Sequence, residues 1–345
     1  MQAELSDKKT ALDVDTSTSP IFSVCTMGTP ECDDELCLFL RCLRVFHPDL
    51  PVIVGCTSSM IDDRGRTTSQ AFSGFRMDKK IEWVPCLDQY GSIDRTAMER
   101  QRGVWFPSRH TDFMMEKANL MERALMLRVE HGGIGTETVA FLDCDVVLLG
   151  ELPRLPRGTV VALSPHRISR ESEMLFGRYN GGFLAAADPL VLHEWRRAAQ
   201  FSRYFDQAAL ESVACGFAAT LHEIPPQHNY GYWRLFQTRR GENPLREGRE
   251  FSIACVGPRR ELTLCYEGAP LRSIHTHFFH SGQQSRHIRA FNGLIKRWIH
   301  RCVCPTAMTA GVTTAAFGVC RGGASIMANT SYKKCFDTNF LTGTY

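Results

Sequence analysis

Short apolar, β-branched runs alternate with amphipathic segments through the first 150 residues, and this alternation limits the possible folds more than any other feature. Each run is typical of a buried strand, and the longer segments have apolar residues at helical spacing. Strands that alternate with helices are joined by right-handed crossovers into a mainly parallel sheet. We therefore expect an α/β fold with a Rossmann-like, mainly parallel central sheet flanked by helices. The expected strands are 21–26, 52–56, 80–87 and 139–142, and the expected helices are 33–46 and about 113–130.

Size and charge exclude several classes of protein. The chain has 345 residues, 43% hydrophobic and 22% charged, which suits a globular protein with a sizeable core. The formal net charge is only +3, and no dense stretch of Lys and Arg is interleaved with aromatic residues. We therefore expect no nucleic-acid partner.

The chain shows no convincing targeting segment. Its first twenty residues are polar, and nowhere does it offer about 18 uninterrupted apolar residues, so we expect no integral membrane segment. The fourteen cysteines are scattered through apolar runs, as at Cys25 and Cys56, and form no Cys-x-x-Cys pair. Free thiols in such runs behave as small hydrophobic groups. Together these features predict a cytoplasmic protein.

The two ends of the sequence differ from its middle. We expect residues 1–19 to be a disordered segment and residues 20–301 to form one domain. Residues 302–345 are rich in Thr, Ala, Gly, Ser and Cys without clear periodicity, which is typical of a poorly ordered tail.

Two acidic residues one position apart, Asp143 and Asp145, follow the apolar run 139–142 and precede a second apolar run, 146–150. Burial on both sides holds the two carboxylates close together, and keeping both ionised there requires a cation. Their oxygen atoms suit Mg²⁺ or Mn²⁺, which share the phosphate oxygens of a substrate. The alternative is a pair of aspartates that caps a turn, but the buried flanks favour a metal site.

Polar or small residues also follow two other expected strands. Thr26 and Gly28 stand at the end of the first, and Asp88 follows the third. In a parallel sheet, ligands collect beyond the carboxyl ends of the strands, so these positions and the acidic pair are expected to converge on one crevice. A loop Thr or Asp is otherwise a common turn former. The arrangement is typical of a nucleotide pocket.

The order of several motifs matches one enzyme family. A helix bearing Lys117 leads into the apolar strand, then Asp-Cys-Asp, an apolar run and an acidic-Leu pair, and further motifs follow at 179–184, 205–210 and 224–230. In this order the chain resembles GT-A-fold glycosyltransferases, especially the retaining family that includes glycogenin and bacterial lipopolysaccharide galactosyl- and glucosyltransferases. The resemblance spans roughly residues 20–300.

The resemblance implies a GT-A domain that moves a sugar from a nucleotide-diphosphate-sugar, most of all a UDP-sugar, to a glycan, protein or small-molecule acceptor. It implies Mn²⁺ or Mg²⁺ as cofactor and transfer with retention, for which no general base is needed. An inverting enzyme would need an acid such as Asp206 or Asp188 as its base. The residues that it places at the donor are Thr26, Gly28, Asp88, Lys117, Asp143, Cys144, Asp145, Gly181 and Gly182, and the catalytic ones are Asn180, Asp206 and Gln207.

Several of these residues have simpler interpretations. Asn180 could be a turn residue, Asp206 a helix N-cap and Lys117 a solvated lysine. Gly181 and Gly182 would let the backbone come close to a sugar ring, since they carry no side chain.

The third metal ligand is where the sequence departs from the family. Relatives end the domain with His-x-x-Gly-x-x-Lys-Pro-Trp, whereas this chain has His275, His277 and His280 and no Lys-Pro-Trp. Strand alternation would place His275 and His277 on one face and His280 on the other. We expect His277 to bind the metal, with His280 next. Arg286 is the candidate for the missing diphosphate lysine, because its guanidinium suits phosphate.

Three other classes were weighed. Haloacid-dehalogenase-type phosphatases also begin with a strand and Asp-x-Asp, but they need a further acidic pair downstream, which this chain lacks. Nucleotidyltransferases need a Gly-rich, basic loop after the first strand, and the sequence there is Gly28-Thr29-Pro30. The remaining alternative is a catalytically inactive or regulatory protein that binds a sugar nucleotide.

Overall fold

A seven-stranded sheet forms the centre of the protein, in the order β10-β8-β9-β5-β2-β3-β4. The computed structural model describes residues 17–91, 93–130, 137–236, 251–256, 261–279 and 286–299. Every neighbouring pair in this sheet is parallel except the two pairs that β9 makes, with β5 and β8. The strands are β2 (Ile21–Met27), β3 (Val52–Cys56), β4 (Ile81–Pro85), β5 (Thr138–Leu142), β8 (Val161–Pro165), β9 (Tyr179–Ala186) and β10 (Leu221–Glu223).

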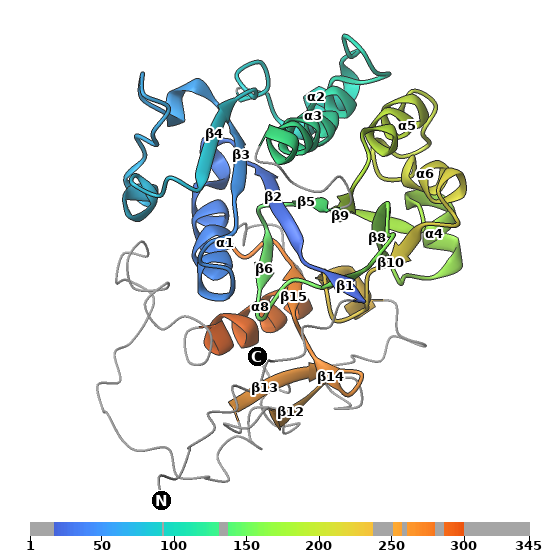
Figure 1. The fold of residues 1–345 in the computed structure, drawn as a ribbon. Coiled ribbons are helices and arrows are strands. Elements are labelled where there is room, and N and C mark those ends of the chain that lie inside the picture. The colour runs from blue at the N-terminus through green and yellow to red at the C-terminus, as the bar shows by residue number, and fades with distance from the viewer. Residues whose placement is uncertain are drawn as a thin grey trace, which may run out of the picture.

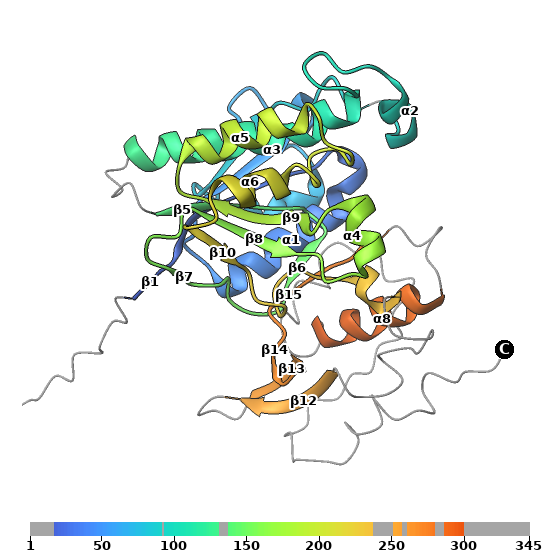
Figure 2. The ribbon, with the colours of Figure 1, turned by 90° about the vertical axis from the view of Figure 1, so that its right-hand side faces the viewer.

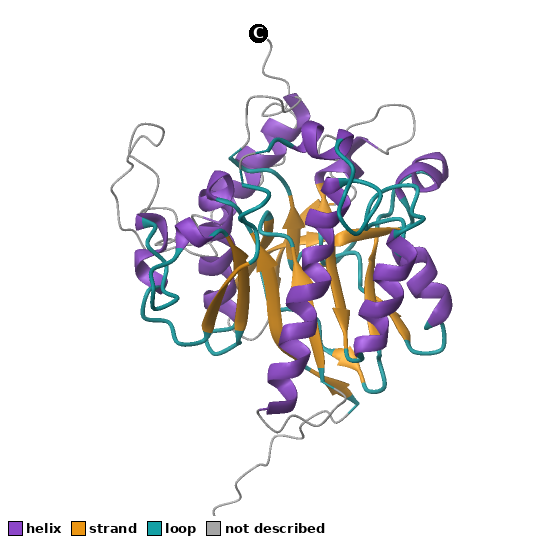
Figure 3. Cartoon of the chain, turned by 90° about the horizontal axis from the view of Figure 1, so that it is seen from above, coloured by secondary structure: helices purple, strands orange, loops and turns teal. Residues whose placement is uncertain are grey.

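Helices cover both faces of this sheet, because its central strands carry apolar residues on both sides. On one face lie α3 (Arg109–Glu130), α5 (Pro189–Ala199) and α6 (Leu210–Gly216), packed against Ile53 and Phe141. On the other lies α1 (Asp33–Phe46), in the same apolar cluster as Val54 and Leu142, and α8 (Arg286–Trp298) lies farther out on this side. Figure 1 and Figure 2 show these layers, and Figure 3 shows the strands side by side behind the long helix.

Smaller elements complete the described part of the chain. A three-stranded sheet, in the order β11-β15-β6, lies on the α1 and α8 side (Figure 1), and β12-β13-β14 form another. The strands are β1 (Thr18–Ser19), β6 (Val146–Leu148), β7 (Leu155–Pro156), β11 (Tyr230–Gly231), β12 (Phe251–Val256), β13 (Glu261–Tyr266), β14 (Ala269–Pro270) and β15 (Ser273–His275). The short helices are α2 (Arg95–Arg100), α4 (Arg170–Phe176) and the 3₁₀ turns Pro30–Cys32, Ser58–Met60, Gln70–Phe75 and Tyr232–Phe236.

The α/β class and the mainly parallel sheet are confirmed. The four expected strands and the helix over 33–46 appear within a residue or two of their predicted bounds. The second helix begins at Arg109, one turn before the expected start at residue 113. This first turn consists of polar residues. One of them, Asp112, holds the preceding loop, because its carboxylate accepts the backbone N–H groups of Val104, Trp105 and Phe106. Apolar periodicity cannot reveal a turn of that kind.

The predicted boundary at residue 19 falls within the fold, because Thr18 and Ser19 form β1 and pair with β7. Residues 1–16 and the expected tail, 302–345, lie outside the described residues. Within the ranges that the structure describes, no helix combines the length and apolar composition needed to cross a bilayer. The cysteines in these described ranges are free thiols, and most of them are buried in apolar surroundings.

Three buried histidines are expected to make the fold sensitive to acid. Burial lowers the pKa of His110 and His166 to about 4 and that of His228 to about 3. In the unfolded chain these rings take up protons near pH 6.5, so the unfolded state binds more protons as the pH falls from 6.5 towards 4. Their contribution to stability is therefore complete above pH 6.5 and is lost below it.

We predict that His228→Gln reduces proton uptake on unfolding near pH 5 by about one proton, and so flattens the fall in Tm between pH 6.5 and 4.5. Thermal unfolding across this range, in buffer without divalent cations, measures the slope. His193→Gln changes an exposed histidine on α5 and should leave the wild-type slope. Equal slopes in all three proteins would show that His228 is not neutral in the folded state.

Candidate functional site

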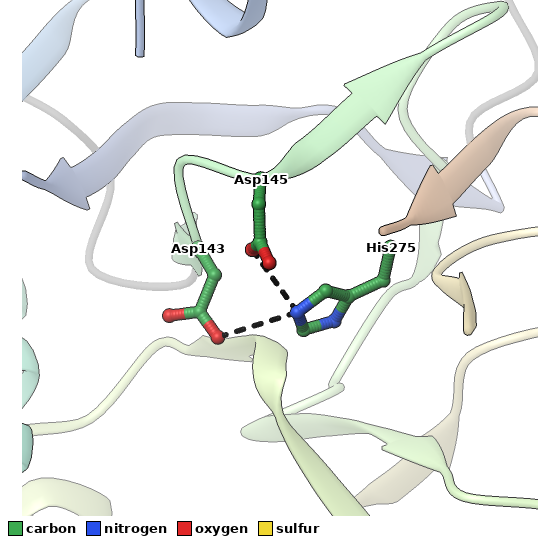
Figure 4. Close-up of side chains that lie close together, drawn as sticks. All are labelled: Asp143, Asp145 and His275. Carbon is green, nitrogen blue, oxygen red and sulfur yellow. Dashed lines mark ion pairs between the residues drawn. The ribbon is translucent and has the colours of Figure 1, made fainter. Parts of the chain in front are cut away.

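A tight turn between β5 and β6 carries the two aspartates. β5 is buried along its whole length, and after its last residue the backbone N–H of Asp143 donates to the carbonyl of Gly182 on β9 at 3.0 Å. The N–H of Val146 then donates to the carbonyl of Asp143, also at 3.0 Å, and β6 begins. Because apolar strands fix both ends of this turn, both carboxylates project from it towards His275 (Figure 4).

His275 reaches the acidic pair through strand pairing. β15 is antiparallel to β6, with His275 opposite Val146, the residue that follows Asp145. His275 Nε2 lies 3.0 Å from Asp145 Oδ1 and 3.8 Å from Asp143 Oδ2 (Figure 4). One ligand atom from each of the three residues lies within 4.8 Å of the others. Two carboxylates and one imidazole thus surround a common point, as a divalent cation requires.

His277 is the expected third ligand, but the structure places His275 rather than His277 next to both aspartates. Strand β15 ends at His275, so the alternation of side chains between the two faces of a strand does not continue to residue 277. His277 Nδ1 lies 2.9 Å from Asp145 Oδ2, and its half-exposed side chain pairs with this carboxylate from another side. Its hydrogen bond with Asp145 raises the pKa of His277 to about 9. His280 lies outside the described residues, and so does the side chain of Arg286, the first residue of α8.

Lys117 lies beneath the acidic pair and is fully buried, so the solvated-lysine interpretation was wrong. Its Nζ is 3.0 Å from Asp143 Oδ1 and 3.5 Å from Asp206 Oδ2, and it donates to the carbonyl of Gly181 at 3.1 Å. Burial lowers the pKa of Lys117, but the two carboxylates outweigh burial and the net shift is upward. An ammonium group has three N–H donors, and these three oxygens match them.

The charges around this point do not cancel. Asp143, Asp145 and Asp206 contribute three carboxylates, and Lys117 contributes one fixed positive charge. Burial raises the pKa of Asp206, and the Lys117 ammonium opposes that rise. Burial also raises the pKa of Asp145, but the charge of His275 and the hydrogen bonds from both histidines outweigh it and hold this pKa well below its usual value. The carboxylates therefore outnumber the ammonium group, and a divalent cation would offset this excess of negative charge.

Gly181 and Gly182 let other groups come close to their backbone. In this structure those groups are protein side chains, whereas the expected group was a sugar ring. A Cβ atom on Gly181 would lie 2.8 Å from Asp206 Oδ2. A Cβ atom on Gly182 would collide with the His275 ring, at 2.6 Å from Nδ1 and even closer to Cε1. The missing side chains therefore make room for the candidate metal ligand and for the carboxylate beside Lys117.

Asn180 and Gln207 lie side by side next to this cluster. Asn180 is buried within β9, which excludes the turn interpretation, and its Nδ2 donates to Gln207 Oε1 at 3.1 Å. Gln207 Nε2 donates to the carbonyl of Phe176 at 2.7 Å. Asp206 does not act as a helix N-cap, since α6 begins only at Leu210 and its N-cap residue is Ala209.

The remaining predicted donor residues lie along the same edge of the sheet. Gly28 packs against the turn, where a Cβ atom on it would lie 3.8 Å from Cys144 Sγ. The Thr26 hydroxyl is buried, with no hydrogen-bond partner among the described residues. Asp88 is exposed and accepts hydrogen bonds from the backbone N–H and the hydroxyl of Ser58, both at 2.6 Å. The close contacts therefore join Gly28 and Cys144 to the acidic pair, while Thr26 and Asp88 stand apart from it.

Asp188 lies at the opposite edge. It follows β9, which is antiparallel to β5, with Ala186 opposite Val139 at the start of β5. Its carboxylate caps α5 by accepting the N–H of Leu190 at 2.8 Å. A base acting at the acidic pair therefore cannot be Asp188.

Sequence reasoning missed the residues that support His275. Asn229, Ser164 and His166 are all buried and bond to one another through Asn180 or directly. Asn229 belongs to the segment 224–230 that matches the family, and it directly precedes β11. Its left-handed backbone, with φ at 53°, is the kind of position that favours asparagine. The preference of asparagine for this backbone conformation was the available signal in the sequence for a special role of Asn229.

Comparison with known proteins gives a distant similarity. No protein-family model matches the chain, and no curated protein matches it. Similar solved structures include an active-site mutant of LgtC, at 13% identity and TM-score 0.42, covering 80% of this chain and 95% of that one. Galactosyltransferase LgtC in complex with donor and acceptor sugar analogues matches at 14% and 0.41, covering 84% and 93%. The bifunctional glycosyltransferase WbbM matches at 11% and 0.39, covering 64% and 41%. At these values no residue role or substrate carries over from them to this chain.

We predict that Lys117→Met lowers the free energy of unfolding by about 3–5 kcal/mol, because it leaves buried carboxylates without their cation. Denaturant unfolding in the presence of EDTA measures this loss. Adding Asp206→Asn to the same chain removes one of the orphaned charges and should recover part of the stability. A loss below about 1 kcal/mol would instead indicate that Lys117 is not the buried counter-ion.

We also predict that Gly182→Ala weakens Mn²⁺ binding by about tenfold or more, because the added methyl group displaces the His275 ring. Electron paramagnetic resonance titration of Mn²⁺ measures the affinity. Gly216→Ala is the matched control, since a Cβ atom there meets nothing within 4 Å. Unchanged affinity in Gly182→Ala would count against His275 as a ligand.

Proposed function

We propose that the chain is a metal-dependent glycosyltransferase that transfers a sugar from a nucleotide-diphosphate-sugar, a UDP-sugar in the first place, to a glycan, protein or small-molecule acceptor. The observation that carries this proposal is the cluster of Asp143, Asp145 and His275 beyond the carboxyl end of β5, next to a buried lysine. The order of the sequence motifs, which resembles that of GT-A glycosyltransferases, supports the same conclusion.

The residues present fit a divalent cation. Two carboxylate oxygens and one imidazole nitrogen suit Mn²⁺, which accepts nitrogen as well as oxygen ligands, better than Mg²⁺, which prefers oxygen. Three protein ligands leave positions that diphosphate oxygens could occupy. When bound, such an ion would offset the negative charge that develops on a departing nucleoside diphosphate.

The neighbouring residues have supporting roles in this proposal. Lys117 offsets part of the charge of Asp143 and Asp206, so their negative charge does not have to be balanced wholly by the metal ion. Gly181 has no side chain to separate Asp206 from the cluster. In this proposal the Asp206 carboxylate therefore lies close to the donor sugar. Gln207, fixed by its bond to the carbonyl of Phe176, lies beside it.

We propose retention of configuration at the anomeric carbon. An inverting enzyme needs a carboxylate base that is free to take a proton from the acceptor. Of the two acids considered, Asp188 lies at the opposite edge of the sheet, and Asp206 is buried against Lys117. This favours a reaction in which the chain supplies no base of its own.

The proposal predicts Mn²⁺-dependent donor hydrolysis or transfer in a screen of UDP- and GDP-sugars. Asp145→Asn should lower the rate by roughly 100- to 1,000-fold, because it removes a carboxylate from the place where charge is stabilised. Asp188→Asn makes the same chemical change at the opposite edge, where asparagine also caps a helix well, and should leave the rate unchanged.

Activity that survives both EDTA and Asp145→Asn would overturn the assignment. Mn²⁺-dependent binding of a UDP-sugar without turnover, with any acceptor class tested, would instead identify a protein that binds sugar nucleotides without catalysis. Equilibrium dialysis with the same donors separates these two outcomes.

A further inference from the structure

A chain of buried side-chain amides connects His275 to the backbone of β9. Asn229 lies between His275 and Asn180, with 3.0 Å from its Oδ1 to His275 Nδ1 and 2.9 Å from its Nδ2 to Asn180 Oδ1. Asn229 is completely buried, and Asn180 is nearly so. In such surroundings each donor has to meet an acceptor, so the orientation of each amide group can be deduced from its neighbours.

The orientation of Asn180 follows from groups that have only one role. The backbone N–H of Gly182 can only donate, and it points at the Asn180 side chain from 2.9 Å, so the atom that it meets is the oxygen, Oδ1. The amide nitrogen of Asn180 then faces Gln207 Oε1 at 3.1 Å. The other end of Gln207 donates to the carbonyl of Phe176, which can only accept, so this bond requires the same orientation.

His166 gives an independent check. Its Nδ1 lies 3.0 Å from the carbonyl of Gly177, which can only accept, so Nδ1 carries a proton. Burial lowers the pKa of His166, so the ring is neutral and its Nε2 accepts. That nitrogen lies 3.3 Å from Asn180 Nδ2, the atom already identified as a donor.

The orientation of Asn229 is then fixed in turn. Because Asn180 presents an oxygen to it, Asn229 must present its Nδ2, and this nitrogen also donates to Ser164 Oγ at 3.0 Å. Only the Asn229 oxygen is left for His275. An oxygen can only accept, so Nδ1 of His275 carries a proton. Nε2 faces the Asp145 carboxylate at 3.0 Å and is the nitrogen that would meet a cation between Asp143 and Asp145, in place of a proton shared with that carboxylate.

We propose that Asn229 is a positioning residue that fixes the tautomer and ring orientation of His275, so that Nε2 is presented to the metal. This inference rests on the proposed function in so far as that function supplies the metal. The backbone of Asn229 contributes to the same end, since its N–H donates to Ser273 Oγ at 2.7 Å, two residues before the histidine. Hydrogen bonds of this kind to the second nitrogen of a metal-binding histidine commonly strengthen metal binding.

Two substitutions separate the role of the side chain from that of the backbone. The φ of 53° at Asn229 suits glycine and aspartate, so neither Asn229→Gly nor Asn229→Asp strains the backbone at this position. Asn229→Gly removes the acceptor for Nδ1–H, whereas Asn229→Asp keeps an oxygen there. Circular dichroism and thermal unfolding are the controls that test whether each variant is folded.

The first measurement is made on the metal-free protein with ¹⁵N-labelled histidine, by NMR. The wild type and Asn229→Asp should show a proton on His275 Nδ1, held against exchange, and Asn229→Gly should lose this signature. The second measurement is Mn²⁺ affinity, which Asn229→Gly should weaken by about 10- to 100-fold, with Asn229→Asp much closer to the wild type. With ¹¹³Cd²⁺ in place of Mn²⁺, the coupling should appear on Nε2.

A wild-type His275 with its Nδ1 unprotonated, or an Asn229→Gly variant with unchanged Nδ1 signal and unchanged Mn²⁺ affinity, would overturn the inference. A wild type that binds no divalent cation but keeps the protonated Nδ1 would overturn the proposed function and leave the assigned tautomer supported.

Discussion

The buried ion cluster around Lys117 is the interaction on which the site depends. Asp143 and Asp206 come from segments more than sixty residues apart in sequence, and both approach the same ammonium group. Without that charge, the buried Asp206 carboxylate and the partly exposed Asp143 carboxylate could not both be kept ionised side by side. The lysine is itself held by α3, whose apolar face packs on β2 and β5. The electrostatics of the site therefore follow directly from the packing of a helix on the sheet.

The antiparallel strand β9 organises the polar residues around this cluster. Its insertion between β5 and β8 places Gly182 beside Asp143 and Asn180 opposite Ser164. Because β9 is antiparallel to β5, it is the first residues of β9, including 180–182, that lie at the edge of the acidic pair. One strand thus supplies an amide for the buried network and two positions without side chains, where His275 and Asp206 can approach.

The sequence predicted β2, β3, β4 and β5 of the central sheet and the place of the acidic pair after β5, because these depend on local patterns, but it did not predict β8, β10 or the antiparallel direction of β9. Apolar runs mark β2, β3 and β5, and the turn after β5 has an Asp at each side of Cys144. It did not single out the position of His275 beside both aspartates or the hydrogen bonds of Asn229, because those depend on long-range pairing. β15 stops at His275 because its partner, β6, has only three residues, and no local pattern near residue 275 reveals the length of β6. In the same way, the use of Lys117 as a buried counter-ion depends on Asp206, which lies 89 positions later in the sequence.

The site joins distant parts of the chain, and this has a thermodynamic consequence. Asp145 and His275 lie 130 positions apart, and the intervening segment contains β6, β7, β11, β12, β13 and β14 of the smaller sheets as well as β8, β9 and β10. An ion held by both would close a loop of this length, and its binding free energy would add to the stability of the folded arrangement. A bound metal ion would therefore act as a long-range cross-link. Its binding would be coupled to the packing of the C-terminal strand β15 and helix α8 on the rest of the fold.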